Sequence, residues 1–450
     1  MKKSFRVALF FVVLVLFAAV AAWAGGAKDL KGKTIVIGNF WEDWDANTWK
    51  PRNESEELMV DWRKKIQKEY GFSIKEKMVA DWNNMLPMIT SSVMAGRPAA
   101  QAFRVAPDWA MALQKQKLLA PVSDSKAVDL SNTVPIAYKQ AAYNQEVARL
   151  FTFGGKTYAF APGGIGASGH ASGIYYNKRL YREAGLDPDL PYDMQKAGTW
   201  TWDAFFDICK KVTRDRNNTG RIDTYAIPSD SAKTILDIFV YSNGANYIAK
   251  DAAGKFVNAT GRPEFIEALK FCERLMDEGV MMMRPEGSDY SFYIPAFMDG
   301  RIAMILEAEW VRSQLVNMVD DWGYVLPPKG PRAKDYRFAD DENVVIIPAT
   351  YKGEDVDMIL TAMNLWVTPT ADNWKDGMWD HYRDRRAVEE TLTMFRNPRY
   401  ASFRNFMLIP GLETGEIAWI MWWMNGDPAQ LVESVSLKWD ALIKEANAIN

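Results

Sequence analysis

Acidic side chains stand directly beside tryptophans at three places in the first quarter of the chain. The first is the run Asn39-Phe-Trp-Glu-Asp-Trp44, and two isolated acid–tryptophan pairs follow. An indole face can stack on the C–H face of a pyranose ring, while carboxylates accept hydrogen bonds from sugar hydroxyls. The candidate ligand-binding residues defined by this pairing are Trp41, Glu42, Asp43, Trp44, Asp81, Trp82, Asp108 and Trp109. The alternative, that these indoles pack in the core or against helix ends, stays open.

Composition supports an aromatic binding surface and argues against nucleic-acid, nucleotide and histidine-metal sites. Eighteen Trp, 18 Tyr and 22 Phe make up 13% of the chain, and Trp is well above its ordinary usage. The formal net charge is only -3, which argues against a nucleic-acid partner because such proteins carry clustered basic surfaces. The glycine-rich run 163–173 lacks the Lys-Ser/Thr ending of a phosphate loop, and two His are too few for a histidine metal cluster.

The N-terminus has the pattern of an export signal. Lys2, Lys3 and Arg6 precede an apolar stretch, Val7–Val20, and the small-x-small pattern of Ala22-Trp-Ala24 follows. We therefore expect residues 1–24 to be a signal peptide and the mature protein to be secreted, periplasmic and soluble. No cysteine lies near the expected cleavage site, so no lipid anchor is expected.

Periodicity predicts an α/β fold. The apolar run 34–38 predicts a buried strand, and a helix follows from the capping pair Asn53 and Glu56 to Gly71. Residues 72–79 predict a second strand and 85–94 a second helix, which is the alternation of a parallel sheet. The mature chain of about 425 residues exceeds the roughly 250 to 300 at which single cores stop growing, so two domains are expected.

Both cysteines fall within predicted helices. Cys209 lies in 202–212 and Cys272 in 263–276, each on an apolar stripe. We expect them to be small buried hydrophobic residues rather than a disulfide pair. Further helices are predicted at 177–184 and near the C-terminus.

One loop has the beginning of a calcium-binding pattern. Oxygen-bearing side chains occupy its positions one, three, five and nine, with Gly220 at six: Asp215, Asn217, Thr219 and Asp223. The twelfth position is Ala226 instead of Glu. A structural calcium ion and a plain turn both explain this sequence, and no cofactor is otherwise required.

Five segments, in order, resemble the carbohydrate-uptake family of extracellular solute-binding proteins that contains maltose-binding protein. They are Gly155-Lys-Thr-Tyr158 with Pro162, Ile174-Tyr-Tyr-Asn-Lys-Arg-Leu180 with Glu183-Ala-Gly-Leu186, Thr199-Trp-Thr-Trp-Asp203, Phe297-Met-Asp-Gly-Arg-Ile-Ala-Met304, and Trp322-Gly-Tyr with Pro327-Pro-Lys-Gly-Pro331. The chain departs from the family at Arg97–Arg104, where a Pro-Asp pair usually ends the third strand. The segment 372–386, which is rich in charged residues and contains Trp, looks like an insertion relative to the family, and no role is assigned to it.

The resemblance implies two discontinuous α/β lobes joined by a hinge, of the type II periplasmic binding protein class. By analogy, lobe one comprises 25–145 and 343–405, and lobe two comprises 146–342 and 406–450. A ligand cleft is expected at the carboxyl ends of the strands. In lobe two the resemblance places Trp310 against the ligand, with Glu309 and Arg312 beside it; a buried helix-packing Trp310 and an exposed Arg312 are the alternatives.

The function implied is capture of a mono- or oligosaccharide and its delivery to the membrane permease subunits of an ATP-binding cassette importer, by a monomer without catalysis. One rival is the same fold binding a peptide or polyamine, which aromatic and acidic residues also suit. Another is a secreted glycoside hydrolase, for which Glu307, Glu309 and the acid–tryptophan pairs would supply an acid and a base or nucleophile.

Overall fold

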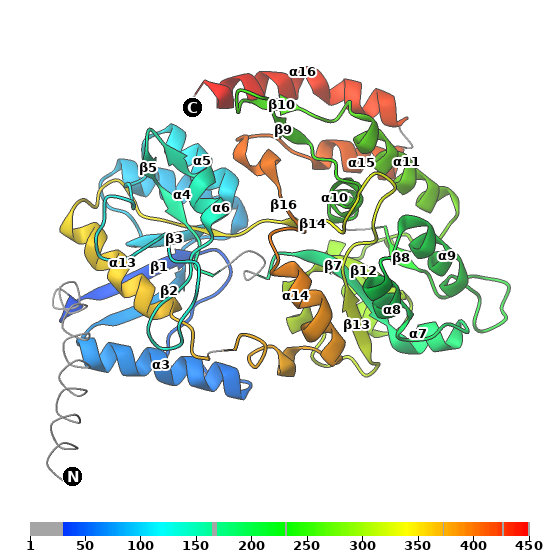
Figure 1. Ribbon diagram of the computed structural model, residues 1–450, viewed down its shortest axis with the longest axis horizontal. Helices are drawn as coiled ribbons and strands as arrows, with labels where there is room; N and C mark the ends of the chain where they lie inside the picture. Colours follow the sequence, from blue (N-terminus) through cyan, green and yellow to red (C-terminus); the bar gives the residue numbers. More distant parts are fainter. Residues whose placement is uncertain (1–29, 164–168, 230–231, 372, 425–426, 449–450) are drawn as a thin grey trace, which may run out of the picture. The chain divides into compact units, whose positions relative to one another are not determined.

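A computed structural model describes residues 30–163, 169–229, 232–371, 373–424 and 427–448 (Figure 1). The chain divides into two compact units, each made of two separate segments: unit 1 is Met1–Gly163 with Asn343–Asp372, and unit 2 is Gly164–Glu342 with Asn373–Asn450. The expected signal peptide lies outside the described residues. Within the described part of the chain, no helix combines the length and apolar character needed to cross a membrane.

Unit 1 is built on a mixed five-stranded sheet with the order β2-β1-β3-β15-β6. The first three strands are parallel, and β15 runs antiparallel to its neighbours β3 and β6. The strands of unit 1 are β1 (Thr34–Asn39), β2 (Ser73–Met78), β3 (Ala102–Val105), β4 (Thr152–Phe153), β5 (Lys156–Thr157), β6 (Ala159–Phe160) and β15 (Val344–Ile346). The expected strands at 34–38 and 72–79 are confirmed.

The helices of unit 1 cover both faces of this sheet. They are α3 (Glu54–Tyr70), α4 (Trp82–Met94), α5 (Pro107–Lys115), α6 (Gln145–Leu150) and α13 (Glu354–Val367). Figure 1 shows α4 and α5 on the face opposite α3. The predicted ends of α3 are confirmed, because the Asn53 side chain accepts a hydrogen bond from the Glu56 N–H and Gly71 takes a left-handed conformation. Helices α3 and α13 share one apolar core with β1 and β2.

Unit 2 has several small sheets instead of one large one. The largest has the antiparallel order β12-β7-β13, and Gly323 in β13 lies against the Tyr176 ring, where a Cβ atom would clash. The strands are β7 (Ser172–Asn177), β8 (Ile227–Pro228), β9 (Ile248–Lys250), β10 (Phe256–Asn258), β11 (Met281–Met282), β12 (Met304–Ala308), β13 (Trp322–Val325), β14 (Phe338–Asp340) and β16 (Ala401–Phe403).

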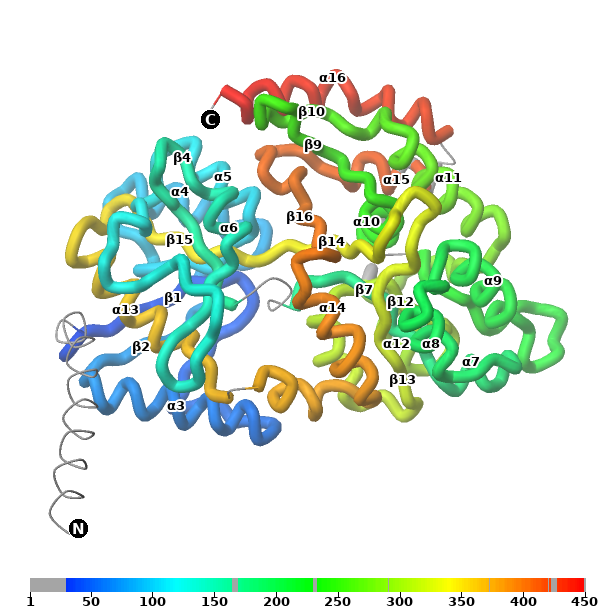
Figure 2. The backbone as a smooth tube through the Cα atoms, in the orientation of Figure 1, coloured from blue at the N-terminus to red at the C-terminus, as the bar shows by residue number. Residues whose placement is uncertain are grey.

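Helices surround these sheets, and α16 lies along the β9–β10 hairpin (Figure 2). The α-helices are α7 (Lys178–Glu183), α8 (Leu190–Ala197), α9 (Trp202–Val212), α10 (Ala232–Ser242), α11 (Pro263–Asp277), α12 (Tyr293–Met298), α14 (Thr393–Phe395), α15 (Gly415–Met424) and α16 (Pro428–Asn447). Shorter helical turns are η2 (Tyr290–Phe292), η3 (Glu309–Gln314), η4 (Trp379–His381), η5 (Ala387–Leu392) and η6 (Asn405–Leu408). Cys209 in α9 and Cys272 in α11 are free and buried, as expected.

Two of the positions at which the chain passes from one unit to the other differ from the expected lobe boundaries. Residues 146–163 group with unit 1 rather than lobe two, because β6 extends the unit 1 sheet beside β15. Residues 373–405 group with unit 2 rather than lobe one, because β16 pairs with β14 and η5 contacts β13. The boundaries placed at 145 and 405 are therefore corrected to 163 and 372.

A buried ion-pair network holds distant segments of unit 2 together. The Arg404 guanidinium, whose side chain is only 9% exposed, pairs with Asp237 at 3.1 Å and with Asp341 at 2.8 Å. Asp341 in turn contacts His170 Nδ1 at 2.9 Å. Burial raises the pKa of Asp341, but Arg404 and His170 outweigh it and hold this pKa well below its usual range.

This network predicts an acid-sensitive contribution to stability. The folded-state pKa of Asp341 lies below its unfolded value of about 3.9. The stabilisation of the fold by ionised Asp341 is therefore complete above pH values of about 3.9, and it is lost as the pH falls from there through the folded-state pKa. Asp341→Asn should lower the free energy of unfolding by about 3 kcal/mol at neutral pH, with a smaller deficit in acid. Denaturant unfolding at several pH values measures both effects.

The matched control is Asp335→Asn, which breaks an ion pair with Arg399 whose side chains are 38% and 62% exposed. Exposed pairs contribute about 1 kcal/mol or less. Equal losses in the two variants, or a loss in Asp341→Asn that does not shrink in acid, would contradict a stabilising role for the network.

Candidate functional site

Four aromatic rings gather where the parallel strands of unit 1 end. Phe40 follows β1 directly, and its ring lies edge-on to Trp41, Trp82 and Trp109 at centroid distances of 4.8, 5.0 and 5.3 Å. Trp82 and Trp109 are themselves 4.5 Å apart. Trp109 is buried, whereas 54% of Trp82 is exposed. We call these four residues the aromatic platform of unit 1; it offers Trp82 to a ligand on a support of packed rings.

The turn that carries Trp41 is shaped by buried Asn39. The Asn39 Oδ1 accepts hydrogen bonds from the backbone N–H groups of Trp41 and Glu42, and its Nδ2 donates to the Glu42 carbonyl at 2.8 Å. Asp43 accepts from the Met78 N–H at 2.8 Å, which ties the turn to the end of β2. Glu42 and Asp43 are both exposed beside the platform.

The other predicted acids lie at helix starts. Asp81 is the N-cap of α4 and accepts from the Asn84 N–H at 3.0 Å. Asp108 is half-buried in the first turn of α5. Both carboxylates complement the positive end of a helix. Their adjacent tryptophans, Trp82 and Trp109, therefore project from the first turns of α4 and α5.

Trp44 has a structural environment instead of an open face. It is only 8% exposed and packs against Trp366 of α13 at 5.0 Å. The guanidinium of Arg63 lies over both indoles, 4.3 Å from Trp44 and 3.8 Å from Trp366. Burial lowers the pKa of Arg63 to about 10. Trp44 is thus part of the apolar core of unit 1.

Two charged residues that sequence analysis did not single out connect this core to the platform. Glu76 accepts from Trp366 Nε1 and pairs with Arg104 Nη1, both at 3.2 Å. Arg104 also lies over the Trp41 ring at 4.7 Å. Burial raises the pKa of Glu76, but Arg104 and Arg63 outweigh it, and the pKa is lowered overall. The carboxylate is therefore ionised at neutral pH, and it positions Arg104 against Trp41.

In unit 2, the candidate residues follow β12. Trp310 is 42% exposed, and its backbone N–H donates to the Gly169 carbonyl at 2.9 Å. Glu309 is 1% exposed, with Oε2 accepting from Tyr382 Oη at 3.1 Å. Arg312 Nη1 lies 3.8 Å from the same oxygen and donates to the Glu309 carbonyl. The structure brings these three residues together, and we call them, with Tyr382, the η3 cluster.

One buried oxygen of the η3 cluster has no hydrogen-bond partner among the described residues. Glu309 Oε1 is buried and accepts no hydrogen bond within the described part of the chain. Leaving a buried acceptor unsatisfied costs about 1–3 kcal/mol, so a ligand hydroxyl or a water at this oxygen is favoured. Glu307, by contrast, is engaged by Tyr293 Oη at 2.9 Å. Tyr382 was missed because the segment that carries it has no periodic pattern.

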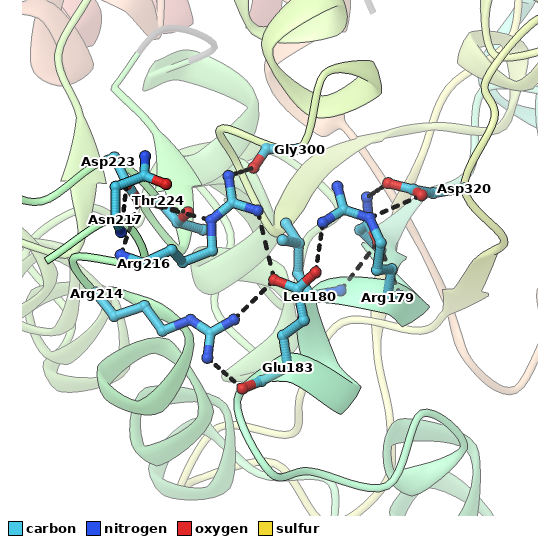
Figure 3. A network of polar contacts seen from close by, with 11 residues as sticks. Arg179, Leu180, Glu183, Arg214, Arg216, Asn217, Asp223, Thr224, Gly300 and Asp320 are labelled. Carbon is cyan, nitrogen blue, oxygen red and sulfur yellow. Dashed lines mark hydrogen bonds and ion pairs between the residues drawn. The ribbon is translucent and has the colours of Figure 1, made fainter.

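The expected calcium loop is held by its own hydrogen bonds, of which Figure 3 shows those made by Asp223. Asp215 accepts from the backbone N–H groups of Thr219 and Gly220, and Asp223 accepts from those of Arg216 and Asn217. The Arg216 guanidinium lies 3.6 Å from Asp223 and also contacts Glu183. These carboxylates face N–H donors and a cation, which is a poor set of surroundings for a calcium ion.

Comparison with solved structures shows the same fold in proteins of low sequence identity. A substrate-binding protein of an ATP-binding cassette transporter from Listeria monocytogenes, in complex with cycloalternan, has a TM-score of 0.60 and 17% identity; the match covers 92% of this chain and 98% of that one. The maltose/maltodextrin-binding domain from Bdellovibrio bacteriovorus bound to maltotriose has a TM-score of 0.59 and 14% identity, and the match covers 91% of this chain and 100% of that one. UgpB from Mycobacterium tuberculosis in complex with glycerophosphocholine has a TM-score of 0.63 and 15% identity, and the match covers 90% of this chain and 98% of that one.

The sequence itself matches one protein family over most of its length. A search of curated proteins finds no match. The family match runs from residue 53 to 360, well over half of the 450 residues, and includes strands and helices of both units. The expected α/β fold of the periplasmic binding protein class is confirmed by the solved structures. The chain is therefore a member of the bacterial extracellular solute-binding protein family.

Proposed function

We propose that the protein captures a carbohydrate and delivers it to the permease subunits of an ATP-binding cassette importer. The observation that carries this proposal is the aromatic platform of unit 1, where exposed Trp82 stands on packed rings beside Glu42 and Asp43. A flat apolar face with acceptors at its edge matches a sugar ring with its hydroxyl rim. Trp310 and Glu309 supply the same two kinds of contact in unit 2.

The ligands bound in similar structures support this choice without deciding it. Cycloalternan and maltotriose are carbohydrates, whereas glycerophosphocholine carries a phosphate and a quaternary ammonium. The charges at the two places are mixed. Arg104 at the platform is paired with Glu76, and Arg312 at the η3 cluster lies beside Glu309. Exposed Glu42 and Asp43 beside the platform would attract a cation, so the binding screen below decides between a carbohydrate and a polyamine.

The charge environment also favours binding over hydrolysis. A glycosidase needs one carboxyl group to donate a proton and a second to act as base or nucleophile. Glu307 is bonded to Tyr293, and Glu309 is bonded to Tyr382 with Arg312 nearby. We propose that the protein is exported by its N-terminal segment and works as a monomer that returns its ligand chemically unchanged.

The first test is a thermal-shift screen of the mature chain with mono- and oligosaccharides, peptides and polyamines. A ligand at one hundred times its Kd should stabilise the protein by about 2.7 kcal/mol. Trp82→Ala and Trp310→Ala should each weaken sugar binding about tenfold or more in calorimetric titrations, because each removes a stacking face. Trp419→Ala, at an indole 58% exposed on α15, is the matched control and should bind normally.

The outcomes separate the rival functions. Stabilisation by polyamines or peptides alone, or unchanged sugar affinity in both Trp82→Ala and Trp310→Ala, would overturn the carbohydrate proposal. Recovery of cleaved sugar from the complex, detected by mass spectrometry, would replace transport by hydrolysis.

A second prediction concerns the unsatisfied oxygen of Glu309. Glu309→Gln replaces one acceptor oxygen by a donor and should weaken sugar binding about tenfold or more, since charge-assisted hydrogen bonds contribute about 1.5–3 kcal/mol. Glu307→Gln, in the same strand–turn segment, should lower the melting temperature and leave the sugar Kd unchanged. The two variants are compared by titration calorimetry; a normal Kd in Glu309→Gln would remove this residue from the site.

A third prediction concerns the loop 215–223. Since Asp215 and Asp223 already accept backbone hydrogen bonds, neither calcium nor a chelator should change the melting temperature by more than a degree or so. A saturable rise with calcium that Asp215→Asn abolishes would instead support the structural calcium ion suggested by the sequence.

A further inference from the structure

The turn that carries Trp310 has little support of its own. It is the 3-10 helix η3 (Glu309–Gln314), six residues long, and 3-10 helices have poorer hydrogen-bond geometry than α-helices, so runs longer than about four residues are uncommon. The N-cap residue, Ala308, makes no capping hydrogen bond with its side chain. The position of Trp310 therefore depends on contacts that η3 receives from other segments.

The first residues of η3 are held both at the backbone and at a side chain. The Trp310 N–H donates to the Gly169 carbonyl, and Tyr175 Oη donates to the Glu309 carbonyl, both at 2.9 Å. Neither bond reaches the Glu309 carboxylate, which accepts from Tyr382 Oη at 3.1 Å. Burial raises the pKa of Tyr382 well above its ordinary value, so the phenol is a hydrogen-bond donor at neutral pH. Tyr382 thus fixes the side chain next to Trp310.

The residue after Tyr382 holds the other end of the turn. Arg383 Nη2 donates to the carbonyls of Val316 and Met318 at 3.0 and 2.8 Å. These carbonyls lie shortly after Gln314, where η3 ends. Hydrogen bonds from a charged donor are stronger than those between neutral groups. Two consecutive residues therefore contact η3 at its first residue and beyond its last.

The segment that makes these contacts is itself fixed in unit 2. The Tyr382 ring is 7% exposed and lies 5.7 Å from the Trp322 ring of β13. Asp384 forms a largely buried ion pair with Lys178 at the start of α7. A side chain can position a neighbour accurately only when its own position is set by packing and hydrogen bonds. Both conditions hold for residues 382–384.

We propose that Tyr382 and Arg383 are positioning residues that hold Trp310 in the orientation in which it binds sugar. This inference rests on the proposed carbohydrate function and on the place of Trp310 in it. Both residues lie beyond residue 360, where the family match ends, and within the segment that sequence analysis left without a role. They need not touch the ligand, because they act through η3.

The test is calorimetric titration with the tightest-binding sugar from the thermal-shift panel, with maltotriose, cellotriose and mannotriose included in that panel. Tyr382→Phe removes only the hydroxyl, and Arg383→Gln removes the charged donor; each should weaken sugar binding about threefold to tenfold. Arg383→Lys keeps a charged donor and should recover part of the affinity. Arg385→Gln is the matched control and should bind normally, because Arg385 is exposed and lies over the Trp379 ring at 4.6 Å, with no bond to η3 among the described contacts.

A double variant distinguishes positioning from a general loss of stability. In a Trp310→Ala background, Arg383→Gln should cause no further loss of sugar affinity, because the residue it positions is already absent. An additive loss in that background would show that Arg383 does not act through Trp310 and would overturn the proposal. Unchanged affinity in both Tyr382→Phe and Arg383→Gln, or equal losses in Arg383→Gln and Arg385→Gln, would do the same.

The same titrations separate this inference from the function on which it rests. If no sugar of the panel binds the wild-type protein, the carbohydrate proposal fails and the positioning role fails with it. If sugar binds and Trp310→Ala binds it equally well, the positioning role is overturned while the aromatic platform of unit 1 still carries the carbohydrate proposal. If Trp310→Ala loses affinity but Tyr382→Phe and Arg383→Gln do not, the positioning role alone fails.

Discussion

In unit 1, β1 forms parallel pairs with both β2 and β3, and this pairing determines where the candidate site is. Parallel strands end at the same edge of their sheet, so three segments separated by dozens of residues begin side by side there. Phe40, Trp82 and Trp109 come one from each of these segments and pack into a single platform. A change in strand order would scatter these rings.

Charged groups beneath and beside the candidate surfaces are arranged in two different ways. In unit 1, Glu76 is fully engaged by Arg104 and Trp366, and Arg63 lies over two indoles. Such a satisfied network fixes side-chain positions, which reduces the ordering that ligand binding would otherwise require. In unit 2, Glu309 keeps one buried oxygen without a partner among the residues that the structure describes. A buried acceptor without a partner is a position at which a water or a ligand would complete the hydrogen bonding.

Periodicity and capping in the sequence predicted much of the fold because those signals are local. Asn53 and Gly71 bound α3 by contacts within a few residues, and the apolar stripes of α9 and α11 correctly placed both cysteines inside the core. The burial of Trp44 was not predictable in this way, because its partners Arg63 and Trp366 come from distant segments. Tyr382 was missed for two reasons: its own segment has no periodic pattern, and it reaches Glu309 across 73 positions of sequence. The loop 215–223 has the side chains of a calcium site, but the direction of its carboxylates depends on backbone geometry, so calcium binding there stays a prediction.

The two free thiols have a practical consequence for studying this protein. Cys209 and Cys272 are both buried, and burial raises the pKa of each thiol well above its ordinary value. Because the thiolate is the reactive form, neither native cysteine should compete for a maleimide dye in the folded protein. A single cysteine introduced at an exposed position would therefore carry the only fluorophore, and one more in the other unit would give a donor–acceptor pair. The native cysteines therefore need not be replaced before distances are measured by fluorescence energy transfer.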